Sequence, residues 1–257
     1  MRTLCHYKQR KVILLLGVAY LFMGYLCVSV YAQEDRNVMF CKLVEPNICT
    51  KIFSLQQYKT VPTTMENSLF IGDSRTVGLS MYGDLDGADF FAKVGLTAKG
   101  VMHIKRKIPG VGYVSLSRLL EEKRYNKIYL MFGVNEIGGN LSKIWDDYMD
   151  VVHLIQKKQP DAVLILQANL YVTEAYTRKH KSISNRKLKQ FHKMIEQLAD
   201  DKHIFYMDAN TVFEDGAGNL SKQHTKDGVH LTGNGYEKWG KWIKQQTEDM
   251  FLYRIFK

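Results

Sequence analysis

The chain has 257 residues and a formal net charge of +10, and its apolar and charged fractions, 46% and 24%, are those of a folded globular protein. It contains no low-complexity tract, heptad run or internal repeat, which excludes coiled-coil and repeat architectures. The basic balance is typical of a solvated basic surface and would also suit an anionic polymer or lipid surface. No recognisable nucleic-acid-binding motif is present, so no nucleic-acid partner is predicted.

The N-terminus has the pattern of a membrane-targeting segment. Residues 1–11 hold four basic residues and no acid, and residues 12–32 form a stretch without charge. As a helix that stretch spans about 30 Å, one hydrocarbon core. We therefore expect a basic cytoplasmic tail (1–11), a transmembrane anchor (12–32) and an extracytoplasmic remainder, as in a single-pass protein of the cell membrane. Val30, Tyr31 and Ala32 also resemble a signal-peptidase site, so secretion after cleavage behind Ala32 stays open.

Residues 33–65 show no strong periodicity and are predicted to form a stalk or N-terminal extension. They contain Cys41 and Cys49, the only cysteines beyond the apolar segment. Two cysteines outside the cytoplasm can pair, so a Cys41–Cys49 disulfide is predicted, with two buried thiols as the alternative. The sequence has no C-x-x-C motif or His/Cys cluster, and neither a metal nor a cofactor is predicted.

Strand and helix patterns alternate in residues 66–257, which are predicted to form one domain. Short apolar runs typical of strands covered on both faces occur at 68–72, 89–94, 127–132, 162–167 and 203–207. Helical spacing of apolar residues predicts helices at 142–158 and 185–198 and a last helix with Thr232 as its N-cap. This alternation predicts an α/β sandwich with a parallel five-stranded sheet.

Polar, glycine-containing turns follow three of these strands, at residues 72–76 (GDSRT), 133–136 (GVNE) and, beyond a loop, 227–230 (DGVH). Each turn alone is a common surface sequence. Their occurrence together and in this order is much harder to produce by chance. Ligands of parallel α/β sheets bind at the carboxyl ends of the strands, so the three turns predict one shared site.

The residue types in these turns fit nucleophilic catalysis. A serine hydroxyl such as that of Ser74 needs an adjacent base, and His230 can accept its proton if a carboxylate holds the imidazole tautomer. The spacing of Asp227 and His230 lets the carboxylate reach one ring nitrogen while the other faces Ser74. The Ser74 N–H, the Gly95 N–H and the Asn135 side-chain amide are candidate donors to a developing oxyanion.

These blocks resemble the SGNH/GDSL hydrolase family (GDSL-like lipases and acylhydrolases), whose first four letters stand for Ser, Gly, Asn and His. Ser74, Gly95, Asn135 and His230 match those positions, and Asp227 matches the carboxylate before the histidine, over roughly residues 66–247. The resemblance implies a flavodoxin-like three-layer sandwich and ester hydrolysis or acyl transfer without a metal.

The sequence departs from the usual family pattern at Arg75, Glu136 and Leu231, where leucine, aspartate and proline are typical. Arg75 is a candidate contact to an anionic or carbonyl-bearing substrate, or else pairs with an acid such as Glu136. Asn169 follows the fourth strand and is a second candidate substrate contact, with an ordinary loop residue as the alternative.

The leading hypothesis is an extracytoplasmic serine esterase that removes short acyl groups such as acetyl from cell-envelope carbohydrate or another small ester. An O-acyltransferase of the same fold, an inactive carbohydrate-binding module and a membrane-surface scaffold are the alternatives. An α/β-hydrolase is disfavoured because Ser74 does not lie in a G-x-S-x-G elbow.

Overall fold

The computed structural model describes residues 64–256, with side chains described as far as Phe251. The predicted basic tail, membrane segment and Cys41–Cys49 pair, and almost all of the predicted stalk, lie outside the described residues. Within the described part of the chain, no helix is both long enough and apolar enough to cross a membrane.

Five parallel strands form the central sheet: β1 (Ser68–Gly72), β2 (Asp89–Ala92), β5 (Lys127–Met131), β6 (Val163–Gln167) and β7 (Ile204–Met207). Their order is β2-β1-β5-β6-β7, which is the order of a flavodoxin-like sheet. The predicted α/β class and all five predicted strands are confirmed, with strand ends within two residues. The strand order reverses between β1 and β5, and that switch point is where such folds bind ligands.

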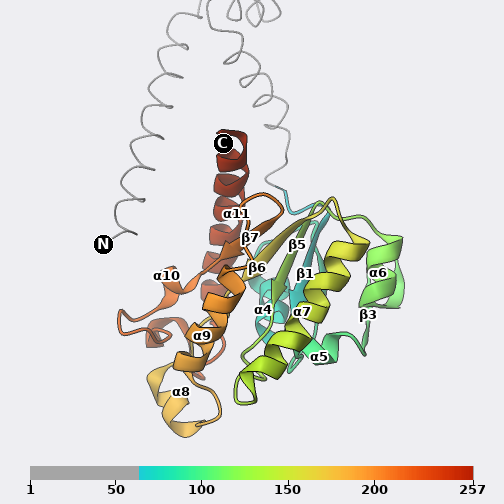
Figure 1. Ribbon diagram of the computed structural model, residues 1–257. Coiled ribbons are helices and arrows are strands. Elements are labelled where there is room, and N and C mark those ends of the chain that lie inside the picture. Colours follow the sequence, from blue (N-terminus) through green and yellow to red (C-terminus); the bar gives the residue numbers. More distant parts are fainter. Residues whose placement is uncertain (1–63, 257) are drawn as a thin grey trace, which may run out of the picture. The chain divides into compact units, whose positions relative to one another are not determined.

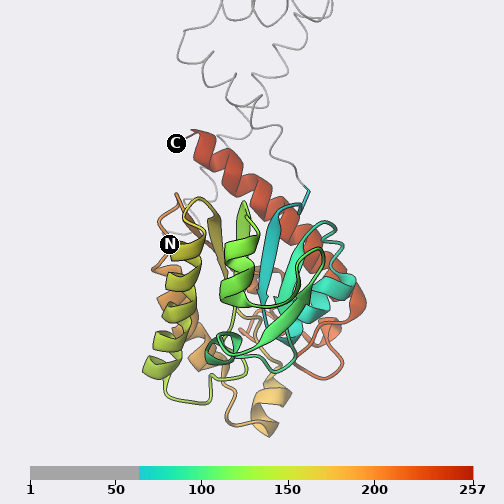
Figure 2. The same ribbon diagram turned by 90° about the vertical axis from the view of Figure 1, so that its right-hand side faces the viewer.

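Helices cover both faces of the sheet, because successive strand residues point to opposite sides. Leu69 and Ile71 face a core shared with α5 (Ala98–Val101), α6 (Leu116–Glu122), α7 (Leu141–Lys158) and α9 (Asn185–Glu196). Phe70 faces the other core, where it stacks on Tyr129 with ring centroids 4.2 Å apart. That side is covered by α4 (Ser74–Tyr82), α10 (Asn210–Phe213) and α11 (Gly233–Phe256). Figures 1 and 2 show the resulting three layers.

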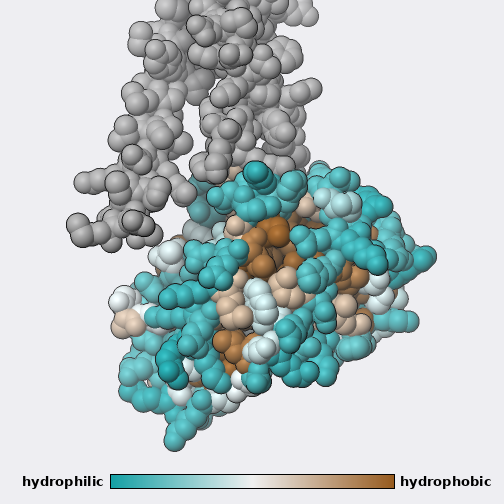
Figure 3. Space-filling view, in the orientation of Figure 1, coloured by the Kyte–Doolittle hydropathy of each residue, from teal (hydrophilic) through white to brown (hydrophobic). Residues whose placement is uncertain are grey.

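The helices begin where the sequence provides caps. The Asn140 side chain accepts the Lys143 N–H at the start of α7, and Thr232 Oγ1 accepts the Gly235 N–H at the start of α11. The predicted apolar face of α7 is buried, as is Trp239 of α11. Hydrophilic residues cover most of the outer surface in Figure 3, with apolar residues showing between them.

Sequence patterns missed an antiparallel hairpin made of β3 (Lys105–Ile108) and β4 (Gly112–Ser115). Its strands are short, and β3 carries three basic residues, so no apolar run marks it. The turn between them contains Pro109 and Gly110, the latter with a φ of +74° that glycine adopts without strain. The short helices α8 (Glu174–Lys179) and η1 (Lys222–His224) complete the described elements.

Candidate active site

The turn from β1 into α4 places Ser74 at the first position of the helix. Asp73 caps α4, its Oδ1 accepting the Arg75 N–H at 2.9 Å. Gly72 is required before it, since a Cβ there would lie 2.1 Å from Thr76 Oγ1 and 2.8 Å from the Met131 carbonyl oxygen. N–H groups in a first helical turn have no intrahelical partner and point toward a ligand at the helix start.

The structure brings together the three residues predicted to carry the chemistry. Ser74 Oγ lies 2.8 Å from His230 Nε2, and His230 Nδ1 lies 2.7 Å from Asp227 Oδ2. The three side chains therefore form one hydrogen-bonded chain, although 156 positions separate the serine from the histidine. Ser74 and His230 are half-buried and Asp227 is exposed, so the site is open to solvent.

The loop that carries His230 is ordered around the Asp227 carboxylate. Asp227 Oδ1 accepts the backbone N–H groups of Val229 (2.9 Å) and His230 (2.8 Å), which leaves Oδ2 for the imidazole. Partial burial on its own would raise the pKa of Asp227, but these hydrogen bonds outweigh it and lower the pKa to about 2. The carboxylate is therefore ionised at neutral pH and can hold the imidazole tautomer. Gly228 packs closely on Thr173, with a φ of +88°.

The three candidate oxyanion donors follow neighbouring strand ends. In the sheet register Gly72 pairs with both Ala92 and Met131. Ser74, Gly95 and Asn135 each follow one of these three paired residues by two to four positions, so all three lie near the same end of the sheet. Gly95 is exposed and has a φ of +73°. One N–H of the Asn135 amide donates to the Leu96 carbonyl at 2.9 Å. An amide nitrogen has two hydrogens, and one remains for another acceptor.

Glu136 holds the same loop from the next position. Its Oε1 accepts the Ala98 N–H at 3.0 Å, while its Oε2 is buried without a hydrogen-bond partner within the described residues. Burial raises the pKa of Glu136 to about 7, despite the Ala98 hydrogen bond, which favours the charged form. The loops after β2 and β5 are thus joined by two adjacent side chains.

Arg75 does not fill either predicted role. Its side chain is 0% exposed, so it cannot touch substrate, and within the described residues it forms no ion pair with Glu136 or with any other carboxylate. Instead, its guanidinium donates to three backbone carbonyls: Leu170 (2.7 Å), Val229 (3.1 Å) and Tyr171 (3.3 Å). Burial lowers the pKa of Arg75, and the neighbouring Asp73 opposes that shift. Arg75 therefore ties the nucleophile turn to the loop after β6 and to the histidine loop.

Asn169 is also buried, which corrects its prediction as a substrate contact. Its side-chain amide donates to the Phe132 carbonyl, and its backbone carbonyl accepts an N–H from Nδ2 of Asn210 at 2.9 Å. Asn210 Oδ1 in turn accepts the Tyr171 N–H at 2.7 Å. These asparagines fix the loops at the carboxyl ends of β5 and β6. The sequence analysis did not predict Asn210 as a residue of this region. Its position three residues after β7 is the one sequence feature that could have indicated it.

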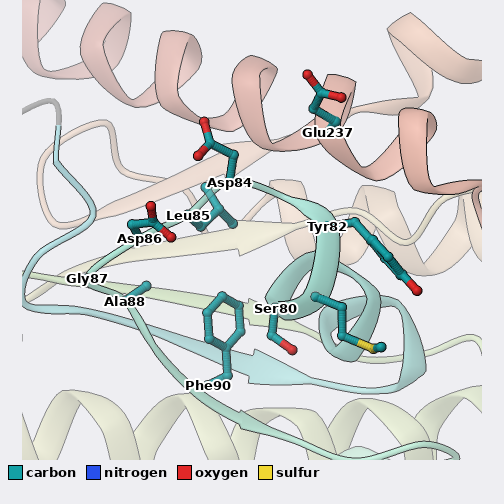
Figure 4. A pocket seen from close by; sticks show the side chains of 10 residues that line it. Ser80, Tyr82, Asp84, Leu85, Asp86, Gly87, Ala88, Phe90 and Glu237 are labelled. Atoms are coloured by element: carbon teal, nitrogen blue, oxygen red, sulfur yellow. The ribbon is translucent and has the colours of Figure 1, made fainter.

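Two cavities stand out in the described part of the chain. The larger, about 550 Å³, lies at the opposite end of α4 from Ser74, and its lining includes Tyr82, Asp84, Phe90 and Glu237 (Figure 4). The smaller, about 230 Å³, is lined by residues 226, 227 and 230–233 and so borders His230. Neither touches Ser74. Within residues 64–256 no cluster of three or more His, Cys, Asp or Glu side chains could hold a metal ion.

The parallel α/β sheet joins a serine, a histidine and an aspartate at its carboxyl edge, and a family match assigns the chain to the hydrolases that act on ester bonds. Residues 70–238 match the profile of the GDSL-like Lipase/Acylhydrolase family, about two thirds of the chain, and the chain belongs to that family. The resemblance inferred from the sequence motifs is thereby confirmed.

Solved structures share the fold at low identity. A Streptococcus pneumonia protein provisionally named a platelet activating factor is 21% identical, with a TM-score of 0.55 over 81% of this chain and 98% of its own. A GDSL-like lipase from Bacteroides thetaiotaomicron is 17% identical, with a TM-score of 0.54 over 77% and 97%. A provisionally named acylhydrolase from Bacteroides fragilis is 18% identical, with a TM-score of 0.55 over 76% and 94%. No curated protein matches the chain significantly.

Proposed function

We propose that the protein is an extracytoplasmic serine esterase in which Ser74 is the nucleophile, His230 the general base and Asp227 the residue that orients the histidine. The observation that carries the proposal is the unbroken hydrogen-bonded chain of Ser74 Oγ, His230 and Asp227, with contacts of 2.8 and 2.7 Å. These are the distances at which a base activates a serine and a carboxylate holds the imidazole.

In the proposed reaction His230 Nε2 takes the proton of Ser74 as Oγ attacks the ester carbonyl carbon. The tetrahedral intermediate collapses, the bond to the alcohol oxygen breaks, and His230 gives its proton to the departing alcohol. Water then attacks the acyl-serine, with His230 again accepting and returning a proton. The products are the carboxylic acid and the free enzyme. Asp227 stays ionised throughout, in keeping with its lowered pKa.

The negative charge of the intermediate would fall at the start of α4. The Ser74 N–H, the Gly95 N–H and the second N–H of Asn135 are the proposed donors there. The positions of these donors support the proposal, because all three follow the ends of adjacent strands. The Asn135 amide also donates to the Leu96 carbonyl in the loop that contains Gly95.

A short acyl group, acetyl in particular, on an extracytoplasmic carbohydrate is the proposed substrate. Ser74 is not part of either prominent cavity, and the larger one is lined by acids at the far end of α4. A long acyl chain normally requires an apolar pocket beside the nucleophile. The uncharged stretch 12–32 behind a basic tail supports export or tethering, so the substrate would lie outside the cytoplasm.

Labelling with a fluorophosphonate, which reacts with activated serines, tests the nucleophile. The wild-type protein should label and turn over acetyl esters faster than long-chain esters, and Ser74→Ala should lose both labelling and turnover while remaining folded. Ser80→Ala is the matched control, because Ser80 is an exposed serine on the same helix. Equal labelling of wild type and Ser74→Ala would refute the serine-esterase mechanism.

Alkylation of Cys41 and Cys49 in non-reduced protein tests the proposed location. A disulfide between them would protect both thiols and would indicate an oxidising compartment. Free, rapidly alkylated thiols in protein taken from the cell envelope would contradict the pairing.

A further inference from the structure

The segment that runs from β2 to α6 carries positive charge and has no acidic residue of its own. Residues 90–120 contain no aspartate or glutamate. They contain six lysines and arginines, at positions 93, 99, 105, 106, 107 and 118. Stretches of one sign usually belong to a solvated face. Here the fold places the start of the stretch next to the candidate site, through Lys93 and Ala98, which makes the surface chemistry of the stretch relevant to substrate.

Most of this charge is exposed and unneutralised. Lys93, Lys99, Lys105 and Lys107 are exposed, and none forms an ion pair with any described carboxylate. Neighbouring cations are different: Arg118 pairs with Glu122, and Lys123 with Asp89, each at 2.6 Å. The four lysines therefore leave a net positive surface able to attract an anion.

The hairpin arranges part of this charge in a row. Lys107 lies opposite Tyr113 and Lys105 opposite Ser115, and directly opposed residues share one face of an antiparallel pair. Tyr113 on that face is 69% exposed, whereas Ile108, on the other face of the hairpin, is 1% exposed and packs in the core. The two lysines are about 7 Å apart along the strand. An exposed aromatic ring thus lies beside two ammonium groups.

The basic segment starts beside the nucleophile turn. The Lys93 N–H donates to the Gly72 carbonyl, two residues before Ser74, at 3.3 Å. From there the chain passes Gly95, is held by Asn135 and Glu136, and continues through α5 into the hairpin. Figure 2 shows this hairpin, in green, running along the molecule beside α6.

We propose that exposed side chains of this segment bind an anionic polysaccharide and lead its ester groups to Ser74. They are here called the basic surface and comprise Lys93, Lys99, Lys105, Lys107 and Tyr113. The proposal rests on the proposed esterase function and names its substrate class. Charges spread over an open surface suit a polymer with repeated carboxylate or phosphate groups better than one small ion. Exposed apolar side chains occur singly along the segment, at Val94, Met102 and Tyr113, and not as the continuous apolar face that a membrane-inserting element presents.

Binding of full-length protein to unacetylated polygalacturonate, which contains no ester to cleave, tests the surface independently of catalysis. Lys105→Gln/Lys107→Gln should weaken binding about tenfold at low salt, and high salt should weaken wild-type binding to a similar extent. Lys157→Gln/Lys202→Gln removes the same charge near the amino ends of β6 and β7, on the opposite edge of the sheet, and should bind like wild type.

Turnover of acetylated polygalacturonate and of 4-nitrophenyl acetate then links the surface to catalysis. The hairpin variant should show a raised KM for the polymer and unchanged kinetics for the small neutral ester. If the wild-type protein binds the polymer but turns over neither ester, the esterase function is refuted and the binding surface is not. Equal polymer affinity of the two double variants would overturn the surface proposal. So would lysine-dependent binding to phosphatidylglycerol vesicles without lysine-dependent polymer binding, which would assign the surface to a membrane.

Discussion

The Arg75 guanidinium donates from Nε to the Val229 carbonyl oxygen at 3.1 Å, across 154 positions of sequence. Arg75 follows Ser74 directly, and Val229 directly precedes His230. The hydrogen bond therefore joins the side chain of the residue after the proposed nucleophile to the backbone of the residue before its base. Two further hydrogen bonds, to the carbonyls of Leu170 and Tyr171, fix the same guanidinium to the loop after β6.

Replacing this arginine by the family's usual leucine should disturb the alignment of Ser74 with His230. Arg75→Leu leaves three carbonyl acceptors without their donor, and small misplacements of catalytic groups cost about 10²-fold in rate. We expect kcat to fall by about 10–10² with KM nearly unchanged, and the melting temperature to drop.

Steady-state kinetics on the folded fraction, together with the rate of fluorophosphonate labelling, measure that effect. Arg75→Lys keeps the charge but can reach fewer of the carbonyls, so it should restore activity only in part. A folded Arg75→Leu protein with wild-type kcat and labelling rate would show that the arginine is not a positioning residue.

The fold was predictable from the sequence where apolar runs were continuous, as in β1 and β5, because strands buried on both faces leave no other pattern. The proximity of Ser74, Asp227 and His230 was predictable because these residue types are tied to one chemistry. The hairpin was not, since its charged strands resemble a loop. The burial of Arg75 was not predictable either, because its partners are backbone carbonyls 95, 96 and 154 positions away. Every residue has a backbone carbonyl, so no residue type in the sequence identifies such partners.

Removing the amide of Asn135 should lower kcat by about 10²–10³ with little change in KM, if that amide donates to the oxyanion only in the transition state. Asn135→Ala also removes the hydrogen bond to the Leu96 carbonyl, so a control for simple loss of structure is needed. Asn140→Ala, which removes the cap of α7, should lower the melting temperature and leave kcat intact. A change confined to KM would assign Asn135 to substrate binding alone.

Asp227→Asn should reduce kcat by about 10²–10⁴ and leave the protein folded. The asparagine oxygen can still accept the Val229 and His230 N–H groups, but the neutral side chain no longer stabilises a charged imidazole. Because the Asp227 pKa is lowered to about 2, its contribution to stability is present above its ordinary pKa of 3.8 and is lost as pH falls through about 2. The activity of the wild type should therefore show no loss from Asp227 protonation above about pH 4.

Glu136 should make stability fall as pH rises. Burial raises its pKa from the ordinary 4.5 to about 7, so the folded protein prefers the protonated carboxyl. The stability that this preference provides is complete below about pH 4.5 and is lost as pH rises through about 7. Glu136→Gln keeps an oxygen for the Ala98 N–H and cannot ionise. The melting temperature of Glu136→Gln relative to wild type should therefore increase between about pH 5 and pH 8. Thermal unfolding followed by circular dichroism across that range measures the difference, and a difference that stays constant with pH would show that Glu136 titrates as an exposed carboxyl.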